Sequence, residues 1–110
     1  MLPVDSREED ALTAYMVVTC RVLDAERYQS EYAPQVIPLL RKYGIELLGA
    51  GLETTALEGD ATSALIFRAE TEAAFESFYN DPANAAPIAL RHSITDGRSM
   101  LVVPAFRPRD

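Results

Sequence analysis

Short runs of β-branched and aromatic residues alternate along this chain with stretches whose apolar residues recur every three or four positions. The first pattern is typical of strands and the second of helices. Strands are predicted over residues 14–22, 45–55, 63–69 and 98–104. Glu58-Gly59-Asp60 forms a polar turn between the second and third of them.

A helical stretch follows the first strand, with Asp24 at its N-cap position. Its apolar stripe consists of Ala25, Tyr28, Tyr32, Val36, Leu40 and Tyr43. Pro34 and Pro38 interrupt this stripe, and a proline ring crowds the carbonyl four residues earlier. We therefore expect one bent helix, or two short helices that meet near Ala33, ending at Gly44.

A second helical region begins after Thr71, a predicted N-cap. Its predicted buried face consists of Phe75, Phe78 and Tyr79. Asn80-Asp81-Pro82 ends this helix and starts another that runs to about Ser93, because Asp81 can cap and proline suits the first helical position. Asp96-Gly97 then predicts a turn before the last strand.

The predicted order is therefore β-α-β-β-α-β, which is the ferredoxin-like pattern of an α+β protein. It predicts a four-stranded antiparallel sheet with its helices on one face. The 110 residues fit a single domain, predicted over 14–106. Of the net charge of −7, −3 falls on residues 1–13 and −4 on the other 97, so we expect a flexible acidic tail at 1–13 and a short tail at 107–110.

Both faces of the predicted sheet are apolar. In the first strand Met16 and Val18 face one side, while Tyr15 and Val17 face the other. Helices would cover only one face, and soluble monomers rarely expose a large apolar patch. We therefore predict a homodimer that packs sheet against sheet. The alternative is that β-propensity alone produced these runs.

Charge and residue counts exclude several classes of function. A pI near 4.6 argues against nucleic-acid partners and anionic membranes, which require clustered Lys and Arg. No apolar run is long enough to span a membrane, and the N-terminus lacks a secretory signal, so we expect a cytoplasmic protein. One Cys and one His cannot build a zinc site within one chain, and no cofactor motif is present, so we expect no metal and no cofactor.

Arg91 and His92 are the candidate catalytic residues. Arg91 could bind a carboxylate or enolate while His92 moves a proton, although neighbours on a helix point about 100° apart. Alternatively, Arg91 neutralises a carboxylate on the first helix or closes the last helical turn, and His92 is a half-exposed residue at the helix end. Cys20 lies on an apolar strand face and is expected to be a small buried hydrophobe.

Tyr28 and Tyr32 are the candidate ligand-binding residues, together with Arg91 and Thr19. The two tyrosines lie one turn apart on the helix face that should cover the sheet. They could donate phenolic hydrogen bonds into a pocket, or they could be core residues with their hydroxyls at the rim. Thr19, late in the first strand, could border the same cleft.

Several short motifs, in this order and spacing, resemble the domain-of-unknown-function 1330 family (DUF1330) over residues 14–106. These motifs are Tyr28-x3-Tyr32, Val36-x-Pro38, Lys42-Tyr43-Gly44, Leu57-Glu58-Gly59-Asp60, Phe78-Tyr79-x2-Pro82, Arg91 and Gly97-Arg98. The resemblance implies a dimeric α+β barrel related to small monooxygenases and isomerases, and it implies no established activity. The chain departs from the family at Ala61 and Asn84, where the family often carries a Trp and another aromatic residue.

Three hypotheses of function follow. The chain could bind a small oxygenated or anionic metabolite in a cleft between helices and sheet. It could instead be a cofactor-independent enzyme of the monooxygenase or isomerase type that uses the same cleft. It could also be a homodimeric assembly module without a ligand.

Overall fold

A computed structural model of the protein describes residues 13–106 and has the predicted order of elements. The strands are β1 (Ala14–Val22), β2 (Glu46–Gly51), β3 (Ser63–Ala69) and β4 (Thr95–Pro104). The helical segments are α2 (Ala25–Arg27), η1 (Tyr28–Tyr32), α3 (Ala33–Lys42), α4 (Glu72–Asn80), η2 (Pro82–Asn84) and α5 (Ala85–Ser93). Apart from Thr13, the two predicted tails lie outside the described residues.

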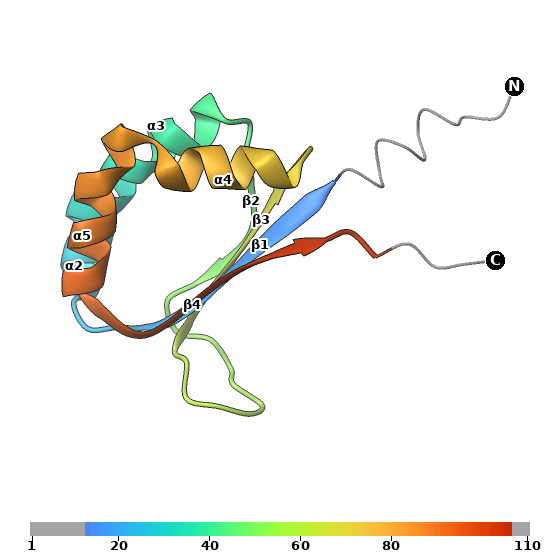
Figure 1. Cartoon of the computed structure of the whole chain (residues 1–110). Coiled ribbons are helices and arrows are strands. Elements are labelled where there is room, and N and C mark those ends of the chain that lie inside the picture. Colours follow the sequence, from blue (N-terminus) through green and yellow to red (C-terminus); the bar gives the residue numbers. More distant parts are fainter. Residues whose placement is uncertain (1–12, 107–110) are drawn as a thin grey trace, which may run out of the picture.

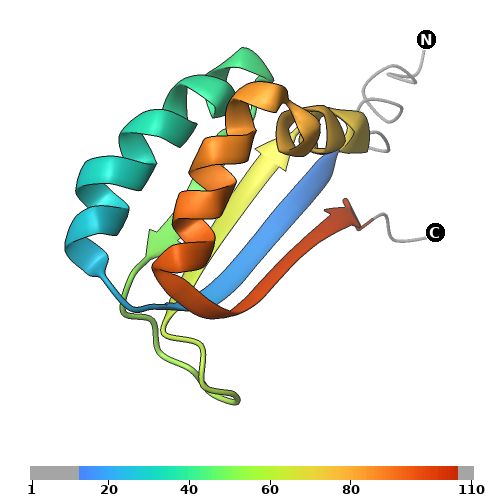
Figure 2. The same ribbon diagram turned by 60° about the vertical axis from the view of Figure 1, so that its left-hand side comes forward.

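The four strands form one antiparallel sheet in the order β2-β3-β1-β4. The helical segments all lie on one face of this sheet, and the opposite face carries no other element of the described chain (Figures 1 and 2). This is the predicted ferredoxin-like topology. The inner face of β1, towards the helices, consists of Ala14, Met16, Val18 and Cys20, all of them buried.

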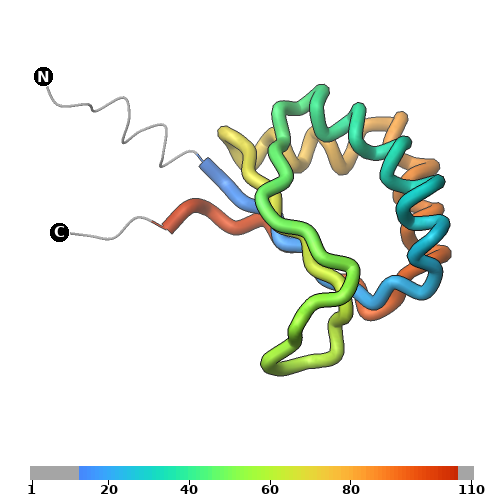
Figure 3. The backbone as a smooth tube through the Cα atoms, turned by 180° about the vertical axis from the view of Figure 1, so that it is seen from behind, coloured from blue at the N-terminus to red at the C-terminus, as the bar shows by residue number. Residues whose placement is uncertain are grey.

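β2 is shorter than the predicted strand at 45–55. It pairs with β3 only as far as Gly51, which lies opposite Ala64, and β3 itself begins at Ser63. Only Ser63 of β3 lies beyond Ala64, so the pairing between the two strands ends here. The chain therefore leaves the sheet as a loop over residues 52–62 that projects away from the helices (Figure 3).

The predicted turn at Asp96-Gly97 is wrong, because both residues belong to β4. The β1–β4 register shifts between Thr19 and Arg21, and Gly97 has a φ of 58° beside that irregularity. A glycine in the left-handed region is typical of a β-bulge, so the local signal marked a bulge within the strand. Arg21 Nε donates to Asp96 Oδ1 at 2.6 Å and joins the two strands at this point.

The first helical region is continuous from α2 to α3, and its hydrogen-bond pattern changes where the bend was predicted. Asp24 caps the segment, as predicted. In η1 the chain makes a π-turn, and the N–H of Ala33 donates to the carbonyl of Tyr28, five residues earlier. The ring of Pro34 crowds the carbonyl of residue 30, and the wider π-turn accommodates this. Gly44 ends the region with a φ of 66°, as predicted.

Asp81 joins the end of α3 to the beginning of the last helical region. Its carboxylate accepts hydrogen bonds from Lys42 Nζ at 2.8 Å and from the Tyr43 hydroxyl at 2.6 Å. It also accepts from the N–H of Ala83, which confirms the predicted cap. The hydrogen bonds from Lys42 and Tyr43 hold the pKa of Asp81 well below its usual range. Asp81 therefore sets where the α4–α5 connection lies relative to α3.

The face of α4 that packs on the sheet is narrower than predicted. Phe75 and Phe78 are buried, whereas Tyr79 is 42% exposed. Thr71 caps α4 through the N–H of Ala74, as predicted, and the helix turns its Phe75–Phe78 side to the sheet. That orientation directs Tyr79 towards solvent.

We expect Phe75→Ala to lower the free energy of unfolding by about 3–5 kcal/mol, because it leaves a cavity in a packed core. Tyr79→Ala in the same helix should change it by less than about 1 kcal/mol. Chemical denaturation followed by circular dichroism measures both values. Equal losses in the two variants would contradict this description of α4.

Candidate functional site

A cavity of about 140 Å³ lies between the helices and the sheet. Its walls are almost entirely apolar. The lining residues from the strands are Met16, Val18, Leu47, Leu65, Phe67 and Met100, and those from the helical segments are Tyr28, Tyr32, Ala33, Val36, Ile37, Leu40, Phe78 and Arg91. Ile37 and Leu47 are 41% and 54% exposed, so the cavity opens to solvent between α3 and the edge strand β2.

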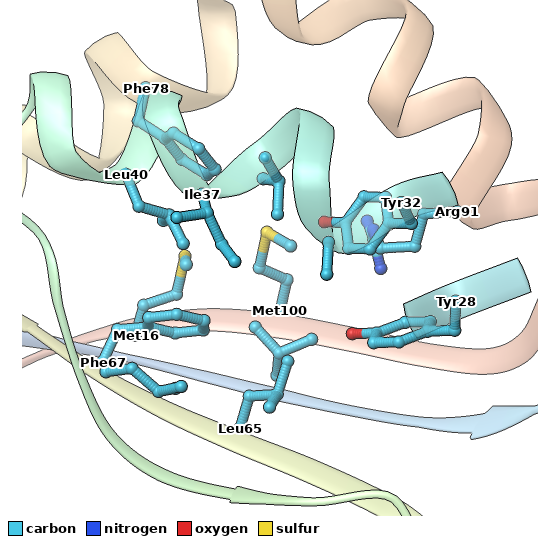
Figure 4. A pocket seen from close by; sticks show the side chains of 14 residues that line it. Met16, Tyr28, Tyr32, Ile37, Leu40, Leu65, Phe67, Phe78, Arg91 and Met100 are labelled. Carbon is cyan, nitrogen blue, oxygen red and sulfur yellow. The ribbon is translucent and has the colours of Figure 1, made fainter. Parts of the chain in front are cut away.

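The polar side chains of the lining gather at one end. Figure 4 shows Tyr28, Tyr32 and Arg91 together on one side of the cavity, and Phe78 and Leu40 on the other. The cavity therefore has a polar end and an apolar end. Of the five site residues predicted from sequence, the structure brings these three together.

Tyr28 and Tyr32 come from the π-turn η1 and are both buried. Their ring centroids lie 5.0 Å apart, with the planes tilted by 47°. Removal from water raises the pKa of both hydroxyls above the usual tyrosine range, and the positive charge of Arg91 opposes this rise only in part. Both phenols are consequently protonated near neutral pH and can donate hydrogen bonds into the cavity.

Arg91 is on α5, where it shares the buried face with Pro87 one turn earlier. The residue is only 4% exposed, and its Nε and Nη1 atoms are buried without a hydrogen-bond partner. No carboxylate among residues 13–106 pairs with it. The acidic residue Glu31 on the first helical region instead pairs with Arg27, at 3.0 Å.

The side chain that closes the end of α5 is that of Arg98, and the guanidinium of Arg91 takes no part in this. Arg98 Nη1 donates to the carbonyls of His92 and Thr95. The Thr95 hydroxyl donates to the carbonyl of Arg91 at 2.6 Å. These bonds hold the backbone of the last helical turn, so the guanidinium of Arg91 is left facing the cavity.

His92 does not reach the cavity. It is exposed and absent from the lining, because adjacent residues on a helix point about 100° apart. Partial removal from water and the charges of Arg91 and Arg98 lower its pKa. The structure thus separates the two candidate catalytic residues.

Thr19 lies on the opposite side of the sheet. Its neighbours Val18 and Cys20 face the helices, so strand alternation directs Thr19 to the outer face. Cys20 is buried on the inner face, as predicted, and burial raises the pKa of its thiol. Neither residue lines the cavity.

Sequence reasoning did not identify the apolar walls of the cavity. Strand alternation places Met16, Val18 and Phe67 on inward-facing positions. Helical spacing places Ile37 and Leu40 on one side of the same helix. The inward direction of all five could therefore be predicted from the sequence. Whether facing side chains fill the space between two layers depends on the distance between the layers, for which a local pattern carries no signal.

The described residues contain neither a metal-binding cluster nor a membrane-spanning helix. Within 13–106, no group of three or more His, Cys, Asp or Glu side chains is placed to hold a metal ion. No helix of that range is long and apolar enough to cross a bilayer.

The topology and the cavity define a small α+β protein of the ferredoxin-like class, with a pocket between its two layers. Residues 13–106 match the model of a family described as "Domain of unknown function (DUF1330)", and the chain belongs to this family. The resemblance noted in the sequence is confirmed. A comparison with curated proteins finds no match.

Solved structures with the same fold include several proteins of unknown function. The RPA0582 protein of Rhodopseudomonas palustris is 16% identical, with 98% of this chain and 95% of that one covered and a TM-score of 0.73. A conserved protein of Methanosarcina mazei Go1 is 14% identical, with coverages of 91% and 99% and a TM-score of 0.59. A protein of Thermobifida fusca YX, described as dimeric and ferredoxin-like, is 19% identical, with coverages of 86% and 92% and a TM-score of 0.52.

The unpartnered guanidinium of Arg91 leads to a prediction about the stability of the protein. Arg91→Met keeps an unbranched side chain of similar helix propensity but removes a buried charge. We expect it to raise the free energy of unfolding of the ligand-free protein by about 1–3 kcal/mol. Denaturant unfolding of protein that has first been unfolded, dialysed and refolded measures this change.

Arg98→Met is the matched control. It should lower the stability, because the carbonyls at the end of α5 lose their donor. A loss of more than 1 kcal/mol in Arg91→Met would mean that Arg91 is held by a structural partner, and it would contradict our description of the site.

Proposed function

We propose that this protein binds a small organic anion in the cavity between its helices and its sheet. The observation that carries the proposal is Arg91, a buried cation at the polar end of the cavity whose Nε and Nη1 have no partner. Burying a charge without compensation costs several kcal/mol. An anionic ligand at this end would supply the missing charge and the missing acceptors.

The two tyrosines support the same proposal. As protonated phenols, Tyr28 and Tyr32 are donors next to the guanidinium. A ligand oxygen at the polar end could accept from a tyrosine and from Arg91 together. Hydrogen bonds to ionised groups are shorter and stronger than neutral ones.

The enzymatic alternative has less support. Within the described chain, the lining contains no carboxylate and no histidine. The raised pKa values of Tyr28 and Tyr32 oppose a role as a base near neutral pH. We therefore propose binding rather than catalysis, and a cytoplasmic location remains part of this proposal.

We also propose a homodimer through the outer face of the sheet. Val17 lies opposite Ile66 on β3 and Leu101 on β4, which gives an apolar row across three strands. Tyr15 and Val103 form a second apolar pair next to this row. The helices leave this face uncovered, and the Thermobifida fusca structure is described as dimeric. A second copy packed sheet to sheet would cover both sets of residues.

Calorimetric titration with a panel of small molecules tests the binding site. The panel contains hexanoate, benzoate, adipate, phenyl phosphate and the neutral benzyl alcohol. We expect at least one anion to bind, and Arg91→Met to weaken that binding by about 30-fold or more, because the charged partner is lost. Tyr79→Phe, outside the cavity, should leave the affinity unchanged.

If no anion binds more tightly than benzyl alcohol, or if Arg91→Met binds the anions as well as the parent chain, the proposed anion site is wrong.

Light scattering during gel filtration tests the dimer. We expect the parent chain to elute as a dimer at micromolar concentration and Leu101→Lys to elute as a folded monomer, because a charge would be buried in the interface. Leu57→Lys in the projecting loop is the control. Leu57 is more exposed than Leu101, at 94% against 59%, and lies outside the apolar row, so this variant should remain a dimer. A monomeric parent chain would overturn the proposal.

A further inference from the structure

We infer that the ligand of this cavity is a short apolar monocarboxylate, with its carboxylate on Arg91 and its apolar body directed towards the opening between Ile37 and Leu47. This inference rests on the proposed anion site and adds the chemical class and the orientation of the ligand. It depends on the charge of the lining, the donors at the polar end and the shape of the cavity.

The charge of the lining selects a monoanion. Arg91 is the one ionised side chain among the lining residues that the structure describes. A carboxylate would neutralise it. A dicarboxylate or a phosphate monoester dianion would carry a second negative charge into an apolar space without a partner, which is strongly unfavourable.

The donors at the polar end suit a carboxylate in particular. A guanidinium presents its N–H groups in a planar fork that matches the two oxygens of a carboxylate. The hydroxyls of Tyr28 and Tyr32 lie at the same end and can donate to the remaining lone pairs. A neutral alcohol would leave the buried cation uncompensated.

The size of the cavity and the position of its opening indicate the size and orientation of the apolar body of the ligand. An apolar cavity of similar size, about 150 Å³, holds a benzene molecule, so about 140 Å³ accommodates an apolar body of about six non-hydrogen atoms next to the carboxylate. Beyond the polar end the walls are apolar, with Phe67, Phe78 and Met100 among them. The opening at Ile37 and Leu47 is at the edge of the sheet, so a longer tail would pass out between α3 and β2.

The first test compares ligands of similar overall size that carry different head groups, by calorimetric titration of the full chain. We expect hexanoate and benzoate to bind at least tenfold more tightly than adipate, phenyl phosphate or benzyl alcohol. If adipate or phenyl phosphate binds as tightly as hexanoate and this binding depends on Arg91, the monocarboxylate inference is wrong while the anion site stands. If no anion exceeds benzyl alcohol, both proposals fail.

The second test measures the affinity for butanoate, hexanoate, octanoate and decanoate. Each buried methylene should strengthen binding by about threefold to fourfold until the tail reaches the opening, and the gain should then fall off. Leu47→Gln should weaken octanoate more than butanoate. Leu48→Gln is the matched control, because Leu48 is equally exposed on the same strand and does not line the cavity. Equal effects of the two variants, or affinities independent of chain length, would overturn the orientation.

Discussion

The alternation of side chains along β1 is the constraint on which the rest of this structure depends. β1 is central in the sheet and pairs with β3 on one side and β4 on the other. Its inner residues Met16 and Val18 line the cavity, and its outer residue Val17 is the middle of the apolar row. A shift of one residue in its register would exchange the two sets. The candidate site and the proposed interface therefore lie back to back on a single strand.

The helical layer sets what the cavity can bind. The π-turn at η1 turns Tyr28 and Tyr32 towards the sheet, and α5 brings Arg91 to the same end of the cavity. Arg98 and Thr95 hold the end of α5, and Asp81 ties the preceding connection to α3. These satisfied polar contacts offset the cost of one buried cation that the described residues leave without a partner. Such a local exception to polar pairing is typical of a functional site.

Much of the architecture could be predicted from local signals. The bounds of β1 and β3 agree with the predicted strands, and Asp24, Thr71 and Asp81 cap the helical segments where expected. The errors arose where a local pattern has two tertiary meanings. Asp96-Gly97 is compatible with a turn and with a bulge, and the pairing of Arg21 with Asp96 across two strands selects the bulge. Tyr79 fits a helical stripe, but the orientation of α4 on the sheet decided which part of the stripe is buried.

The sequence by itself determined the order of the elements, the apolar character of both sheet faces and the helices that carry Tyr28, Tyr32 and Arg91. Periodicity, caps and turn residues act over a few positions, so each of these features could be found locally. Only the tertiary structure decided that these three side chains meet in one cavity, that His92 and Thr19 lie outside it, and that no carboxylate of the described chain reaches Arg91. Those outcomes depend on the distance and the angle between α5, η1 and the sheet, which are determined by packing between residues far apart in the chain.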